Sequence, residues 1–87
     1  MFAEFVSHTV VLDTHVPIVY IGVLTEVSEA GFLLTDADVH DCRDGHATTE
    51  VYINEIRNHG ITPNRKRVFV MRSAVMSVSR LDDVVEQ

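Results

Sequence analysis

Residues 20–24, Tyr-Ile-Gly-Val-Leu, form an apolar run with a single glycine at its centre. Apolar β-branched and aromatic residues favour strands, and a glycine inside a strand marks a bulge or a sharp bend. The run lies within residues 18–27, which follow Pro17 and precede the turn-forming residues 28–31. We therefore predict a long strand over 18–27 that bends at Gly22.

Two more strands flank this one in the sequence. Residues 9–12 (Thr-Val-Val-Leu) predict a first strand, and residues 32–39 (Phe-Leu-Leu-Thr-Asp-Ala-Asp-Val) predict a third. The connections contain turn-forming residues, including Pro17 and Gly31, and Gly31 is able to adopt a positive φ. Residues 9–39 are therefore predicted to form an antiparallel meander of three strands.

The pattern then changes to that of a helix. Three apolar residues recur at helical spacing: Tyr52, Ile53 and Ile56. Thr48 is suited to cap the first turn, and Gly60 is suited to end the last one. We predict a one-sided surface helix over residues 49–59, which together with its cap makes the inserted segment 48–59.

The C-terminal part predicts two short strands. Residues 68–81 (Val-Phe-Val-Met-Arg-Ser-Ala-Val-Met-Ser-Val-Ser-Arg-Leu) contain a fourth strand over 68–71 and a fifth over 74–79, separated by an Arg-Ser pair. Residues 64–67 are predicted to be an exposed polar connection. The 87 residues then form one mostly-β domain with a helix between the third and fourth strands. A core this small is often supplemented by oligomerisation.

Charge is divided unevenly along the chain. Residues 1–50 carry nine acids and one base (net −8), and residues 51–87 carry six bases and four acids (net +2), which sum to −6. The acidic field disfavours non-specific nucleic-acid binding. A local basic patch is the candidate nucleic-acid contact: Arg65, Lys66, Arg67 and Arg72. The alternative is that these bases meet the acids across the fold or across a subunit contact.

The two apolar regions resemble the two-part motif of the Sm/LSm family of small β-barrels. The family's first motif is a strand with the pattern apolar-x-Gly-x-Leu, which residues 20–24 match. Its second motif is an apolar strand that ends in Ile-Arg-Gly and is followed by a short valine-containing strand. Residues 69–78 are similar to this second motif. The resemblance covers residues 9–39 and 68–81.

The resemblance implies a five-stranded, strongly bent antiparallel barrel of the Sm-like type, with the helix inserted between strands three and four. Family members assemble into closed rings in which the fourth strand of one subunit pairs with the fifth strand of the next. Such closure removes exposed sheet edges. The resemblance therefore implies a homo-oligomeric ring of copies of this chain.

The residues with which family members bind uridine-rich RNA are mostly replaced. The supporting aspartate, the stacking side chain and the edge-reading asparagine correspond here to Ser28, Ala30 and Gly31, and the glycine after the arginine corresponds to Ser73. Only Arg72 is retained. Because uridine recognition needs a stacking platform and hydrogen bonds to the base edge, we expect phosphate contacts to RNA without uridine specificity. A protein–protein interaction scaffold with no nucleic-acid role is the alternative.

A third possibility is a metal-binding domain that uses residues 36–46. If this segment stayed extended, one face would carry side chains of metal-ligand type: Asp36, Asp38, His40, Cys42, Asp44 and His46. The simpler interpretation is the solvated acidic end of a strand, because the segment lacks the glycine and the terminal glutamate of a calcium loop. The five histidines form no catalytic pattern, so we expect a non-enzymatic domain without a cofactor or a bound metal.

The sequence also bears on cellular location. Cys42 is the only cysteine, so no intrachain disulfide is expected, which fits a reducing cytoplasm. Residues 1–13 have no basic region and no long apolar core, so we expect no signal peptide. No stretch approaches the ~20 apolar residues of a membrane span. We expect a cytoplasmic protein with no membrane partner.

Overall fold

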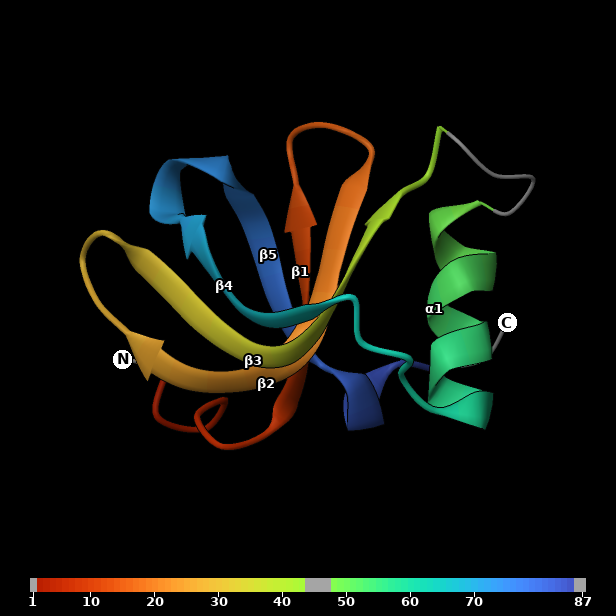
Figure 1. Cartoon of the computed structure of the whole chain (residues 1–87), viewed down its shortest axis with the longest axis horizontal. Coiled ribbons are helices and arrows are strands. Elements are labelled where there is room, and N and C mark those ends of the chain that lie inside the picture. The colour runs from red at the N-terminus through yellow and green to blue at the C-terminus, as the bar shows by residue number, and fades with distance from the viewer. Residues whose placement is uncertain (1, 44–47, 86–87) are drawn as a thin grey trace.

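The computed structural model describes residues 2–43 and 48–85. Its elements follow in the order β1 (Thr9–Thr14), β2 (Ile18–Val27), β3 (Gly31–Asp41), α1 (Thr49–His59), β4 (Arg65–Met71), η1 (Arg72–Ala74), β5 (Val75–Arg80) and η2 (Leu81–Asp83), where η is a short 3-10 turn. The five strands form one antiparallel sheet in the order β4-β3-β2-β1-β5 (Figure 1). The predicted mostly-β fold with one helix between the third and fourth strands is confirmed.

The strands β4 and β5 are the two edges of this sheet. β4 pairs with β3, and β5 pairs with β1. No pairing within the described ranges joins β4 to β5, so the sheet is bent but open, and the predicted closed barrel is not confirmed. Each edge strand therefore has one paired side and one free side.

The sheet bends where β2 carries Gly22. The register between β2 and β3 shifts between Ile21 and Val23, and Asp36 on β3 has a positive φ of 49°, a conformation that aspartate tolerates better than most residues. A Cβ built on Gly22 would lie 3.0 Å from both the Cα and the Cβ of Ala37. β2 and β3 thus approach closely because residue 22 has no side chain, and the irregularity predicted at Gly22 is confirmed.

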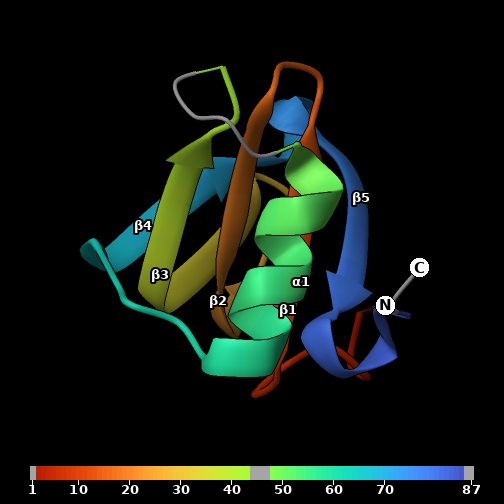
Figure 2. The same cartoon turned by 90° about the vertical axis from the view of Figure 1, so that its right-hand side faces the viewer.

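Each face of the sheet has its own apolar core. The buried residues of the inner face are Val10, Leu12, Leu24, Phe32, Leu34, Ala37 and Val70, and the N-terminal residues Phe2, Phe5 and Val6 pack against them. On the outer face α1 lies over β1 and β2 (Figure 2). The buried residues there are Val11, Val19, Ile21, Tyr52, Ile53 and Ile56. The helix therefore docks through the apolar stripe predicted from its spacing.

The helix α1 begins and ends where the sequence predicts. The Thr48 hydroxyl accepts a hydrogen bond from the backbone N–H of Val51 at 3.3 Å. At the other end Gly60 has a φ of 88°, and its N–H donates to the carbonyl of Ile56 at 2.7 Å. Both caps satisfy backbone groups that a helix end leaves unpaired.

The fourth strand begins three residues earlier than predicted. Residues 65–67, predicted as part of an exposed connection, belong to β4 and pair with β3. The side chain of Asn64 anchors the start of this pairing, because it accepts from the N–H of Val39 and donates to the carbonyl of Val39, each at 3.0 Å. The other strand ends lie within two residues of the prediction.

Gly31 is needed for close packing and not for a turn conformation. Among the described glycines only Gly60 has a positive φ, so the turn does not use the conformational freedom that Gly31 offers. A Cβ at position 31 would overlap the carbonyl oxygen of Val70 and lie 2.9 Å from Cζ of Phe69. The absence of a side chain therefore lets β4 and the Phe69 ring approach the start of β3.

Ile53→Ala tests whether α1 is held by its apolar face. Ile53 is 4% exposed, and truncating a well-buried isoleucine typically costs about 2 kcal/mol or more. We expect a loss of this size in the free energy of unfolding measured by urea denaturation. The matched control Val51→Ala, at a position 48% exposed on the same helix, should change it by less than about 0.5 kcal/mol. Equal effects of the two substitutions would contradict this packing.

Candidate functional site

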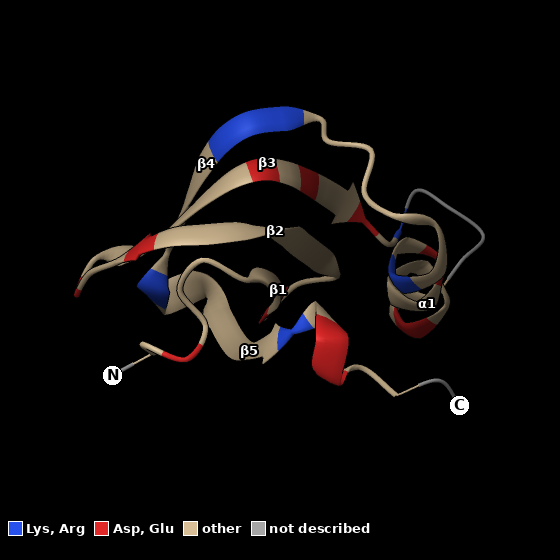
Figure 3. Ribbon diagram, turned by 90° about the horizontal axis from the view of Figure 1, so that it is seen from below, with Lys and Arg blue, Asp and Glu red and all other residues tan. Residues whose placement is uncertain are grey.

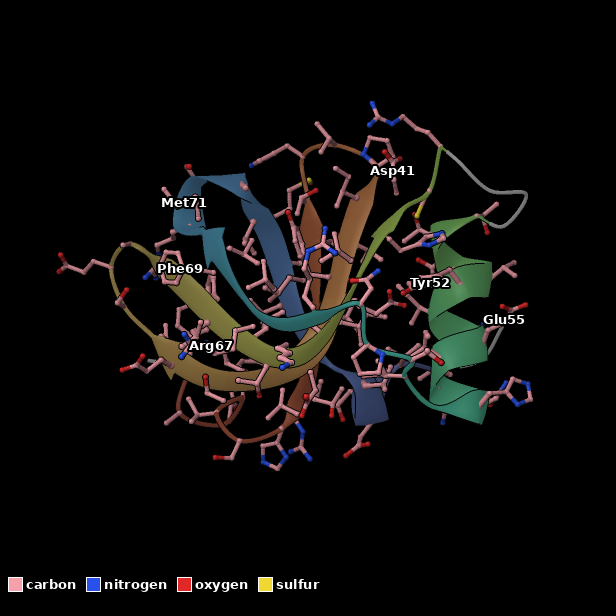
Figure 4. The ribbon with its side chains drawn as sticks, in the orientation of Figure 1. Asp41, Tyr52, Glu55, Arg67, Phe69 and Met71 are labelled. Carbon is pink, nitrogen blue, oxygen red and sulfur yellow. The ribbon has the colours of Figure 1, made fainter. Side chains whose placement is uncertain are left out.

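The candidate site is centred on the edge strand β4. Alternate residues of a strand point to opposite faces of the sheet, and Val68 and Val70 pack into the inner-face core. The residues that alternate with them lie on the outer face, and we call them the outer row: Arg65, Arg67, Phe69 and Met71. Figure 4 shows three of them, Arg67, Phe69 and Met71, following one another along the strand.

The outer row is open to solvent. The side chain of Phe69 is 45% exposed and that of Met71 is 60% exposed, and both arginines are exposed as well. The helix packs over β1 and β2, and through Tyr52 it also contacts Asp38 and His40 in the later part of β3. The outer row on β4 stays exposed. An accessible aromatic ring therefore lies beside two cations on one edge strand.

The basic run Arg65, Lys66 and Arg67 carries three positive charges. Within residues 2–43 and 48–85 none of the three forms a salt bridge with a carboxylate. Acidic residues lie on the neighbouring strand β3, beside the basic stretch of β4 (Figure 3). One of them, Asp38, already accepts a hydrogen bond from Asn64 at 2.9 Å and another from the hydroxyl of Tyr52. The Arg65 guanidinium donates to the carbonyl of Asn64 at 3.0 Å, and the side chains of all three basic residues are exposed to solvent.

The structure separates Arg72 from the basic run with which the sequence grouped it. Arg72 lies in η1, and its guanidinium donates to the carbonyl of Ser28 at 3.0 Å. Its Cζ atom lies 5.3 Å from the centre of the Phe2 ring and 5.9 Å from that of Phe32, distances typical of cation–π contact. Arg72 thus helps to hold the N-terminal segment and the β2–β3 turn against the end of β4.

The β2–β3 turn contains the positions that correspond to the uridine pocket. The hydroxyl of Ser28 accepts from the N–H of Ala30 at 3.2 Å, so this side chain is used within the turn. Phe2, whose role the sequence did not predict, lines a surface pocket of about 340 Å³ here together with Val27, Ser28, Glu29 and Arg72. The Phe2 ring is already engaged by Arg72 and, edge-on at 5.4 Å, by Phe32.

The segment proposed for metal binding has structural partners. His40 stacks on Tyr52 with ring centres 3.8 Å apart and an interplanar angle of 7°. Asp41 pairs with Arg43 at 2.7 Å, and the hydrogen bonds from Arg43 lower the pKa of this carboxyl to about 2. In the described part of the chain no three His, Cys, Asp or Glu side chains gather closely enough to hold a metal. Asp44 and His46 lie outside the described residues.

These contacts form a polar seam between β3 and α1. The hydroxyl of Tyr52 donates to Asp38, and Asn64 binds the other oxygen of the same carboxylate. Burial, and then the hydrogen bond to Asp38, raise the pKa of the Tyr52 hydroxyl above its usual range, so it remains a donor. Nε2 of His40 is buried and has no hydrogen-bond partner among the described residues. The seam fixes the helix next to the start of β4.

No protein-family model matches this chain, and a search of curated proteins finds no match. The Sm-like assignment therefore stays a prediction that rests on the motifs. Over the residues that the structure describes, no helix is long and apolar enough to cross a membrane.

Tyr52→Phe tests the polar seam. The substitution removes the donor to Asp38 and leaves a partly buried carboxylate with one partner fewer, which typically costs about 1–3 kcal/mol. We expect a loss of this size in the free energy of unfolding by urea denaturation. Tyr20→Phe is the matched control, because the Tyr20 hydroxyl makes no hydrogen bond with the described residues. If Tyr52→Phe were as stable as the control, the hydroxyl of Tyr52 would not stabilise the seam.

Proposed function

We propose that this chain is a non-enzymatic Sm-like domain that assembles into a closed homo-oligomeric ring, in which β4 of one copy pairs with β5 of the next. The observation that carries the proposal is the strand order β4-β3-β2-β1-β5, which leaves these two strands as the free edges. An exposed edge offers unpaired backbone groups to another strand. Pairing between two different edges is head-to-tail, and it forms a ring when the rotation closes.

The side chains of both edges support the same proposal. Exposed apolar residues lie on each edge strand, Met71 on β4 and Met76 on β5. On the inner side, Val68 packs against the core from β4, as do Val75 and Val78 from β5. Pairing of the two edges would therefore extend the apolar inner face from one copy to the next and complete the barrel wall between copies.

The second part of the proposal is that the assembly contacts RNA through backbone phosphates and without uridine specificity. The three exposed cations of the basic run on β4, which form no salt bridge with the described residues, support it, since phosphate contacts by Lys and Arg supply most sequence-independent affinity. Ser28, Ala30 and Gly31, the residues of the β2–β3 turn that correspond to the uridine pocket, have no side chain on which a base could stack. A cytoplasmic location, suggested by the single cysteine, fits such a role.

Sedimentation velocity at micromolar concentration tests the assembly. We expect the wild-type chain to sediment as a discrete oligomer of fixed size, because ring closure uses both edges of every copy. Met76→Lys places a charge on the β5 edge and should shift the population toward the monomer. Val51→Lys introduces the same charge on α1, away from both edges, and should leave the oligomer intact. A clean wild-type monomer would contradict the proposal.

Fluorescence anisotropy with labelled oligouridine and oligoadenosine tests the RNA contact. We expect binding at low salt that weakens steeply as salt is added, with no preference for oligouridine, and Arg72→Ala should leave the ratio of the two affinities unchanged. A uridine preference that disappears in Arg72→Ala would show that the pocket is functional after all. Absence of RNA binding at low salt would favour the alternative, a protein–protein interaction scaffold.

A further inference from the structure

The outer row contains an aromatic ring that the core does not use. Phe69 is 45% exposed, although its neighbours in the strand, Val68 and Val70, pack inward. Its ring lies over Gly31, where a Cβ would come within 2.9 Å of Cζ of the ring. Backbone thus supports the ring on one side, and solvent reaches the other.

The cations of the outer row are placed along the same line. Leu33 is the cross-strand partner of Phe69, and Thr35 is that of Arg67. The outer row therefore runs beside the first half of β3, on the part of the outer face that the helix does not cover. Residues two apart on a strand are separated by about 6.5–7 Å. Arg67 and Arg65 therefore follow Phe69 at successive steps along the strand. The Arg65 guanidinium donates to the carbonyl of Asn64 at 3.0 Å, and neither arginine forms a salt bridge within the described ranges.

We propose that Phe69 is a stacking platform for a base of single-stranded RNA, and that Arg67 and Arg65 bind the adjacent phosphates. This inference rests on the proposed RNA contact and adds to it a mode of recognition and a strand requirement. Proteins that bind single strands combine a basic track with aromatic rings on which bases stack. The outer row has both components within one strand, at Arg65, Arg67 and Phe69.

The charge distribution favours RNA over a second protein as the occupant. The outer row presents an exposed ring and exposed cations, which match the bases and the anionic phosphates of a single strand. The chain as a whole is acidic, with a net charge of −6. RNA, which is a polyanion, should therefore bind along this basic row and not on the acidic surface. A base inside a duplex cannot reach the ring. Purines, which have the larger ring system, should stack more strongly than pyrimidines.

Anisotropy titrations of the full chain with a short labelled oligoadenosine test the inference. Loss of one base–aromatic contact typically weakens binding by about tenfold, so Phe69→Leu should bind about tenfold more weakly with an unchanged salt slope. Arg67→Gln should reduce the salt slope by about one, because one phosphate contact is lost. Phe69→Tyr keeps the ring and should retain the wild-type affinity. Val51→Ala, a change at an exposed apolar residue of α1 away from both edge strands, is the control and should have no effect.

The outcomes separate this inference from the broader proposal. If the wild-type chain binds RNA and Phe69→Leu binds it equally well, Phe69 is not a platform, although the phosphate contact stands. Equal affinity for a duplex and for the single strand would also overturn the inference. Dissociation of the Phe69→Leu oligomer in sedimentation velocity would make Phe69 a subunit contact and would overturn it as well. If the wild-type chain binds no RNA at low salt, the proposed RNA contact itself fails.

Discussion

The close approach of β2 and β3 at Gly22 and Ala37 determines how the rest of the chain is arranged. A Cβ at position 22 would lie 3.0 Å from the Cα of Ala37 and from the carbonyl oxygen of Thr35, so the close approach relies on the glycine. The bend turns one face of the sheet inward, where the N-terminal residues and five strands share a core. The sheet is open, with β4 and β5 as its edges. The proposed assembly follows from those two free edges.

The outer face of the sheet has two parts, one that the helix covers and one that we propose binds RNA. Its β1–β2 part is buried by α1, and its β3–β4 part carries the outer row. Asn64 lies at the boundary, where it hydrogen-bonds both the Asp38 carboxylate and the backbone of Val39. The same side chain therefore secures the polar seam of the helix and the start of the basic strand. Loss of this anchor would loosen both parts of the outer face together.

Local signals in the sequence predicted much of the fold. Apolar runs located the strands, Gly22 located the bend, and the Thr48 and Gly60 caps bounded α1 correctly. Residues 65–67 were assigned to a connection because three consecutive basic residues carry no strand signal. Their strand conformation comes from pairing with β3, which is information from a distant part of the chain.

Less of the candidate site than of the fold can be predicted from the sequence. The alternation of β4 could have placed Arg65, Arg67 and Phe69 on one face, but only after the strand was extended to residue 65. The partners of Arg72 depend on Phe2, which belongs to a segment without a periodic pattern. The stacking of His40 on Tyr52 requires the docked helix. In each case a contact between distant segments decides the role of the residue.

Amide hydrogen exchange, followed residue by residue by NMR, tests the proposed pairing of β4 with β5 most directly. In an isolated copy the outward-pointing amides of both edge strands face water, whereas pairing between copies places them in hydrogen bonds. If β4 and β5 pair between copies, these amides should exchange as slowly as those of the central strand β2. Exchange of the outward amides of β4 and β5 at the rate of loop amides would contradict it.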